Sequence, residues 1–96
     1  MLQMFYNCKH LKSLDLSSFN TSKVTVIRLI FGNCTAMTQL KVSNMFRTDN
    51  ATDRSSGFSQ VKGLTVQVPK SSMANVTTWL KNIGFVEGTT GTITTY

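Results

Sequence analysis

The sequence has few of the side chains that catalysis and metal binding need. It holds 4 acidic residues, one histidine and 2 cysteines in 96 residues. His10 stands in a lysine-rich stretch with no carboxylate or nucleophile at a suggestive spacing, so an exposed turn residue is expected there. Cys8 and Cys34 have no neighbouring histidine and form no zinc motif. We therefore expect no enzyme activity, no cofactor and no metal site.

Long apolar runs are also missing. No stretch approaches the length of a membrane-spanning helix, and the N-terminus has neither the basic start nor the apolar core of a signal peptide. Charged residues make up 15% of the chain, so much of the surface must be Ser, Thr, Asn and Gln. That composition is typical of secreted and cell-surface β-rich proteins.

The ten Lys and Arg residues give a net charge of +6 but are scattered along the chain. No aromatic residues are interleaved with them as a base-stacking surface would require, which argues against nucleic-acid binding. Weak attraction to acidic glycans or anionic cell surfaces is an interpretation at least as good for this charge.

A repeat is the strongest positive feature. Residues 5–17 recur at 31–43 with an offset of 26, and Phe, Asn, Cys, Leu and Ser return unchanged. A third, shortened copy is expected from Phe58, which takes the cysteine position, and places Leu64 24 residues after Leu40. A fixed period of this length predicts a stack of similar units that bury their apolar sides against their neighbours.

The alternation within each copy predicts three parallel strands around 14–16, 40–42 and 64–68. Ser22 is a plausible N-cap for a short helix over 23–31, whereas 47–56 reads as an irregular exposed loop. A second helix should begin at Ser71 or Ser72, place Met73, Val76, Trp79 and Leu80 on one stripe, and close at Gly84. Trp79 is expected in the core. The tail 85–96 is expected to be a hairpin or partly disordered.

The predicted fold is thus α/β, a short solenoid of about three parallel strands with helical or irregular returns and a C-terminal capping helix. Repeats occupy 1–68 (about 1–20, 21–46 and 47–68), and 69–96 forms the cap helix and the Thr- and Gly-rich tail.

The expected register defines the outward face of the sheet. It predicts three rows across the strands: Ser13, Gln39 and Gly63; Asp15, Lys41 and Thr65; Ser17, Ser43 and Gln67. We expect Asp15 and Lys41 to form a cross-strand ion pair. Solenoids commonly bind partners on this face. The candidate binding residues are Ser13, Asp15, Ser17, Gln39, Lys41, Ser43, Thr65 and Gln67.

Cys8 and Cys34 should lie one above the other in adjacent units. Free thiols that fill the turn are favoured, although the expected separation also allows a disulfide.

Residues 4–25 (MFYNCKHLKSLDLSSFNTSKVT) closely resemble the BspA-like leucine-rich repeats of bacterial surface proteins, in the variety also seen in Mycoplasma lipoprotein-type repeats. The pattern departs from the family at Val26-Ile27 and at 45–48, as in a degenerate last repeat. The resemblance implies the C-terminal piece of a longer array, a bacterial cell-surface or extracellular location, and adhesion to a protein partner such as a host extracellular-matrix protein.

Two functions follow as hypotheses. One is a non-enzymatic binding module, and the alternative is a structural cap that closes a longer array and binds nothing. In either case the first unit lacks a neighbour beside Phe5, Leu14 and Leu16, so we expect self-association through this edge.

Overall fold

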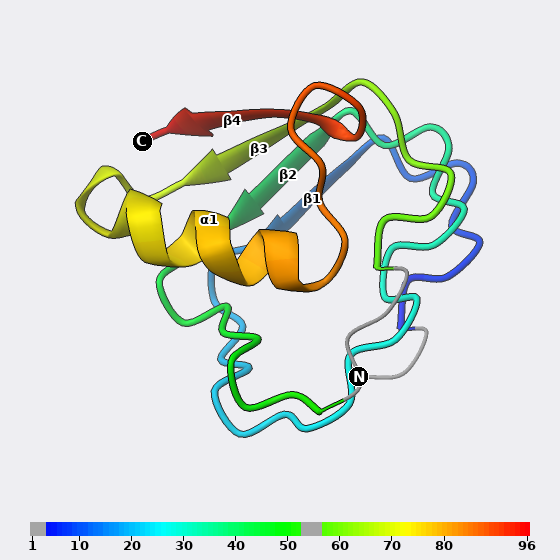
Figure 1. Ribbon diagram of the computed structural model, residues 1–96. Helices are drawn as coiled ribbons and strands as arrows, with labels where there is room; N and C mark the ends of the chain where they lie inside the picture. Colours follow the sequence, from blue (N-terminus) through cyan, green and yellow to red (C-terminus); the bar gives the residue numbers. More distant parts are fainter. Residues whose placement is uncertain (1–3, 53–56) are drawn as a thin grey trace.

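The computed structural model describes residues 4–52 and 57–96, which form a small α/β domain. Its four-stranded sheet is built in sequence order from β1 (Ser13–Leu16), β2 (Gln39–Val42), β3 (Leu64–Val68) and β4 (Gly91–Thr95), and each strand is parallel to the next (Figure 1). A 3-10 turn, η1 (Lys70–Ser72), leads into one helix, α1 (Met73–Asn82), which lies against one face of the sheet.

The strands form where apolar and polar residues alternate, because successive side chains point to opposite faces. Leu16, Leu40, Val42 and the odd positions of LTVQV are buried, and the residues between them are wholly or partly exposed. The three strands predicted from the repeat are confirmed at nearly the expected residues.

The chain enters each strand through a similar turn, and we call residues 5–12, 31–38, 58–63 and 85–90 the entry turns. A phenylalanine opens each one, and each ring contacts the next: Phe5 stacks on Phe31, Phe31 and Phe58 are tilted, and Phe58 meets Phe85 edge to face. We call this column of rings the phenylalanine stack. Ring centroids are 5.9 Å apart for Phe5 and Phe31, 5.1 Å for Phe31 and Phe58, and 5.5 Å for Phe58 and Phe85. These separations are within the range for favourable aromatic pairs, so the stack joins all four turns.

The backbone conformation of the entry turns explains why asparagine recurs in the repeat. Asn7 and Asn33 have φ of 62° and 59°, the left-handed region that asparagine tolerates better than most residues. Asn33 Nδ2 donates to Asn7 Oδ1 at 3.0 Å, and the Asn7 N–H donates to the Gly32 carbonyl at 2.9 Å. Asparagine therefore shapes the first two turns and connects them, whereas Gln60 holds the equivalent position of the third turn with φ of 66°.

The positions of the phenylalanine rings show that the predicted alignment of the third copy of the repeat is wrong. Phe58 lies in the phenylalanine position and not in the cysteine position, because its ring packs against Phe31. Val61 takes the cysteine position, since its N–H donates to the Phe58 carbonyl as that of Cys34 does to Phe31. Leu40 pairs with Val66, so the offset between these strands is 26 residues, and the expected value of 24 is wrong.

The segments that return from one strand to the next differ from the prediction. No helix forms over 23–31. Leu29 has φ of 54°, which no helix accommodates, and β-branched residues crowd the preceding turn. The Thr25 carbonyl accepts a hydrogen bond from the Thr52 N–H at 2.8 Å, which connects this return to the next one.

The second return, expected to be an exposed loop over 47–56, is described only up to residue 52. That part has neither helix nor strand, as predicted. It is not wholly exposed, however, because Thr48 and Ala51 are buried. Residues 53–56 lie outside the described residues.

The third return contains α1, and the predicted helix is confirmed. Ser72 occupies the N-cap position without a capping side-chain hydrogen bond, and Gly84 follows the helix with φ of 101°. Val76 and Leu80 are buried and Trp79 packs against the core. Met73, expected on the same stripe, is exposed, because it precedes the part of the helix that faces the sheet.

The structure differs most from the prediction in the tail, because residues 91–95 form neither a hairpin nor an irregular segment. They pair as β4 in parallel with all five residues of β3, from Leu64 with Gly91 to Val68 with Thr95. Gly91 permits this approach, since a Cβ there would overlap the Leu64 carbonyl. The sheet therefore has one strand more than the sequence predicted.

Candidate functional site

One face of the sheet is polar and is the candidate site. The observed register places two rows of side chains across it: Ser13, Gln39, Thr65 and Thr92; Asp15, Lys41, Gln67 and Thr94. Helix α1 lies on the opposite face (Figure 1). In the described part of the chain no helix covers the polar rows.

These rows keep most of the predicted residues but exchange some neighbours. Thr65 lies beside Gln39, not beside Lys41, and Gln67 lies beside Lys41, not beside Ser43. Gly63 precedes β3 and belongs to neither row. The cause is the two-residue error in the register of the third copy.

Ser17 and Ser43, the third predicted row, lie beyond the ends of their strands. The N–H of Ser17 donates to Asp15 Oδ1 at 2.9 Å, and Ser43 Oγ accepts from the Met45 N–H at 3.1 Å. Both serines shape the turns that leave the sheet and do not extend the polar rows.

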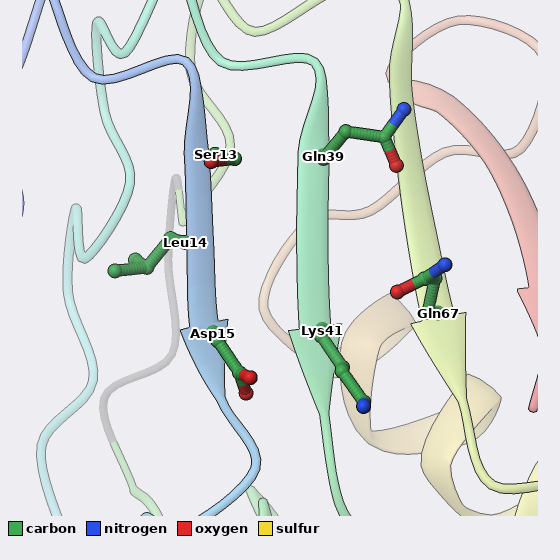
Figure 2. A pocket seen from close by; sticks show the side chains of 6 residues that line it. All are labelled: Ser13, Leu14, Asp15, Gln39, Lys41 and Gln67. Carbon is green, nitrogen blue, oxygen red and sulfur yellow. The ribbon is translucent and has the colours of Figure 1, made fainter.

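A shallow, open pocket lies on the first three strands (Figure 2). Ser13, Asp15, Gln39, Lys41 and Gln67 line it, and Leu14 borders it at the outer edge of β1. The side chains of Gln39 and Gln67 and the hydroxyl of Ser13 make no hydrogen bond to any described residue. These groups are therefore free to bind atoms outside the chain.

Asp15 and Lys41 are direct neighbours on β1 and β2, as expected. Between these two described residues, however, the predicted ion pair does not form. The pKa of the Asp15 carboxyl lies below its ordinary value, first because of the Ser17 side chain, then the Ser17 N–H, with the charge of Lys41 adding to both. The charge of Lys41 thus lowers the pKa of the Asp15 carboxyl without an ion pair between the two side chains.

The partner of Lys41 is Tyr96, which sequence reasoning did not place in the site. The Lys41 ammonium lies 4.5 Å from the centroid of the Tyr96 ring, and the Tyr96 hydroxyl donates to the Val42 carbonyl at 2.8 Å. Burial, with a smaller contribution from Asp15, raises the pKa of the Tyr96 phenol. Tyr96 therefore spans from the end of β4 to β2 and bounds the polar face with a half-exposed ring.

Thr92 and Thr94 were also missed. The sequence feature that could have predicted them is the alternation of polar and apolar residues at Thr92, Ile93 and Thr94, in which Ile93 packs against the core. The signal is weak, because five small residues rich in Thr read equally well as a loop.

The remaining candidates lie away from this face. His10 is exposed, and no group of acidic, histidine and cysteine residues suited to a metal ion is found in ranges 4–52 and 57–96. Trp79 packs against the core, as predicted, while Arg47 lies 5.3 Å from its ring centroid. Cys8 and Cys34 are free thiols.

The fold and the site define a small α/β domain with a four-stranded parallel sheet, one helix and a polar sheet face. The chain belongs to a family described as "Mycoplasma protein of unknown function, DUF285", whose model matches residues 1–94. No curated protein and no solved structure matches the chain. No helix of the described residues is both long and apolar enough to span a membrane.

Proposed function

We propose that this chain is a non-enzymatic, protein-binding adhesion module of a bacterial surface protein of the BspA-like leucine-rich-repeat type. The observation that carries the proposal is the uncovered polar face of an all-parallel sheet. Parallel sheets usually have both faces covered by helices. Repeat proteins are the architecture in which one parallel face stays open and binds partners.

Three features support the leucine-rich-repeat part of the proposal. The strands follow one another at an offset of 26 residues over the first three strands, the phenylalanines stack in one column, and consecutive turns are joined by backbone hydrogen bonds. The resemblance of residues 4–25 to BspA-like repeats adds the sequence pattern. A cell-surface or extracellular location rests on that resemblance.

The partner we propose is a host extracellular-matrix protein. The polar face offers the amides of Gln39 and Gln67 and the hydroxyl of Ser13, which bond to no described residue, and the Lys41 ammonium over the Tyr96 ring, an aromatic group of the kind enriched where binding energy concentrates. A single ring and few charges fit an affinity in the micromolar range, of about −8 kcal/mol.

The test is binding of the full chain to immobilised collagen, laminin and fibronectin by surface plasmon resonance. Lys41→Met and Gln67→Ala should each weaken binding about tenfold, equivalent to about 1.4 kcal/mol, because the first removes the positive charge of the face and the second removes an amide that bonds to no described residue. Lys23→Met is the matched control, since it removes the same charge from the exposed return after β1. It should leave the affinity unchanged.

The outcomes separate the alternatives. Equal weakening by Lys41→Met and Lys23→Met, with loss of binding at raised salt, would mean nonspecific attraction by the net charge, as for an acidic glycan such as heparin. No binding to any of the three matrix proteins would favour the structural-cap alternative. In that case, deletion of 69–96 from a longer parent should cost its solubility.

A further inference from the structure

Cys8 and Cys34 take no part in the proposed binding face, yet they hold the same position in adjacent entry turns. Both are free thiols; Cys34 is fully buried and Cys8 is only partly so. Nothing in the packing requires a thiol at this position, because Val61 fills it in the third turn.

The two cysteines converge on one atom. The Cys34 thiol donates to the Phe5 carbonyl oxygen at 2.8 Å, and the Cys8 N–H donates to the same oxygen at 3.3 Å. Two backbone hydrogen bonds join the turns on either side of this oxygen. The Phe5 N–H donates to the Ile30 carbonyl at 3.0 Å, and the Asn7 N–H donates to the Gly32 carbonyl at 2.9 Å. Adjacent parallel segments lie about 4.8 Å apart, inside the Cα separation of about 4.4–6.8 Å that a disulfide spans.

We propose that Cys8 and Cys34 are an oxidation site, at which a small-molecule disulfide such as oxidised glutathione installs a bond across the first two entry turns. The Cys8 thiolate attacks the glutathione disulfide and releases one glutathione thiol. The Cys34 thiolate then attacks the Cys8 sulfur and releases the second. Two protein thiols are oxidised to one disulfide, and one molecule of oxidised glutathione is reduced to two thiols.

The order of attack follows from the surroundings of the sulfur atoms. Cys8 is the accessible thiol at the edge of the sheet. Cys34 is buried, its S–H is engaged by the Phe5 carbonyl, and burial raises its pKa, so it reacts poorly with glutathione from solution and attacks only the adduct on Cys8, which is held beside it. Cys34 therefore resolves the adduct.

The bond would fasten the edge of the domain. It joins the turn before β1 to the turn before β2 and closes a chain loop between residues 8 and 34. Since β1 has a strand partner on only one side among the described strands, its turn is the part of the sheet that gains most from a covalent link. Oxidation should raise the melting temperature by roughly 10 °C.

The test is equilibration of the unmodified full chain in glutathione buffers, with free-thiol counting and peptide mapping by mass spectrometry. We expect loss of both thiols, a mass lower by two hydrogen atoms, a Cys8–Cys34 linked peptide and no retained glutathione. Cys34→Ser should stop at a glutathione adduct on Cys8.

The same titration of the unmodified chain unfolded in concentrated urea is the reference for the folded chain. The comparison therefore needs no substituted variant that must fold. The folded chain should close the bond at a glutathione ratio at least about tenfold more reducing than the unfolded chain, because the fold holds the thiols together. An equal or less favourable ratio would overturn the proposal. So would a persistent adduct on Cys8 of the unmodified chain, or dimers linked by disulfides in place of the internal bond.

Discussion

Buried hydroxyl groups join consecutive return segments at the scale of single residues. Thr21 is buried, accepts from the Arg47 N–H at 2.6 Å and donates to the Arg47 carbonyl at 2.7 Å. Thr48, the equivalent residue of the next return, donates to the Trp79 carbonyl at 2.8 Å. Irregular returns leave backbone groups without regular partners, and these hydroxyls satisfy them.

Thr21→Val should therefore destabilise the domain although it keeps the shape of the side chain. It leaves the N–H and carbonyl of Arg47 without the hydroxyl that both contact, at a cost of about 1–3 kcal/mol. Urea unfolding measures the loss. Thr35→Val, at an exposed position whose hydroxyl makes no hydrogen bond to a described residue, is the control and should change stability by under about 0.5 kcal/mol. Equal effects of the two substitutions would refute this role for Thr21.

The carboxyl of Asp15 gives a prediction of pH dependence. Its folded pKa is below the ordinary value of 3.8, so its contribution to stability is complete above that value and is lost as the pH falls through the folded pKa. An NMR titration should show the low pKa directly. Ser17→Ala should raise this pKa more than Lys41→Met does, because the side-chain hydrogen bond of Ser17 is the largest cause and the charge of Lys41 is a smaller one. The reverse ranking would mean that charge dominates.

At the scale of elements, the sequence predicts the elements that have a local apolar spacing and misses those that contacts between distant residues decide. β1, β2 and α1 follow from apolar spacing, which is a local property. The return over 23–31 has helical spacing too, but Leu29 in the left-handed region and hydrogen bonds to the next return override it. The register of β3 depends on which phenylalanine joins the stack, and β4 depends on a backbone approach at Gly91. Both are contacts between distant residues that spacing alone does not reveal.

Gly91→Ala tests the origin of β4. The added Cβ would overlap the Leu64 carbonyl, so β4 must separate from β3 or the backbone must shift, at a cost of about 2–3 kcal/mol. Thermal unfolding reports the loss. The rate of amide hydrogen exchange should increase more over 91–96 than in the other strands of the sheet. Thr92→Ala, at an exposed position of the same strand, is the matched control and should have a small effect. A stable Gly91→Ala variant with protected amides would contradict this account.

At the scale of the whole molecule, the sheet has two edge strands. Among residues 4–52 and 57–96, no strand pairs with the outer side of β1. Leu14 and Phe5 are only partly buried there, although both pack against the core. Among the described residues, the column of phenylalanine rings has a ring on both sides of Phe31 and on one side of Phe5. An apolar, unpaired edge of this kind favours pairing with another chain.

We therefore predict reversible self-association through β1. Light scattering should show a dimer or a larger assembly that dissociates on dilution. Leu14→Lys should shift the equilibrium to monomer, because a charge on an edge strand opposes pairing. Thr78→Lys, on the exposed side of α1, adds the same charge and should leave the assembly intact. A monomer at every working concentration would contradict the prediction.

We propose the polar sheet face as the surface through which this domain contacts its partner. Lysine acetylation footprinting tests this proposal most directly, with the full chain bound to whichever of the three matrix proteins it recognises. Lys41 should be protected from acetylation on binding, whereas Lys23 and Lys81, exposed on the return after β1 and on α1, should react as in the free chain. Protection of Lys23 or Lys81 with unchanged reactivity at Lys41 would contradict the account.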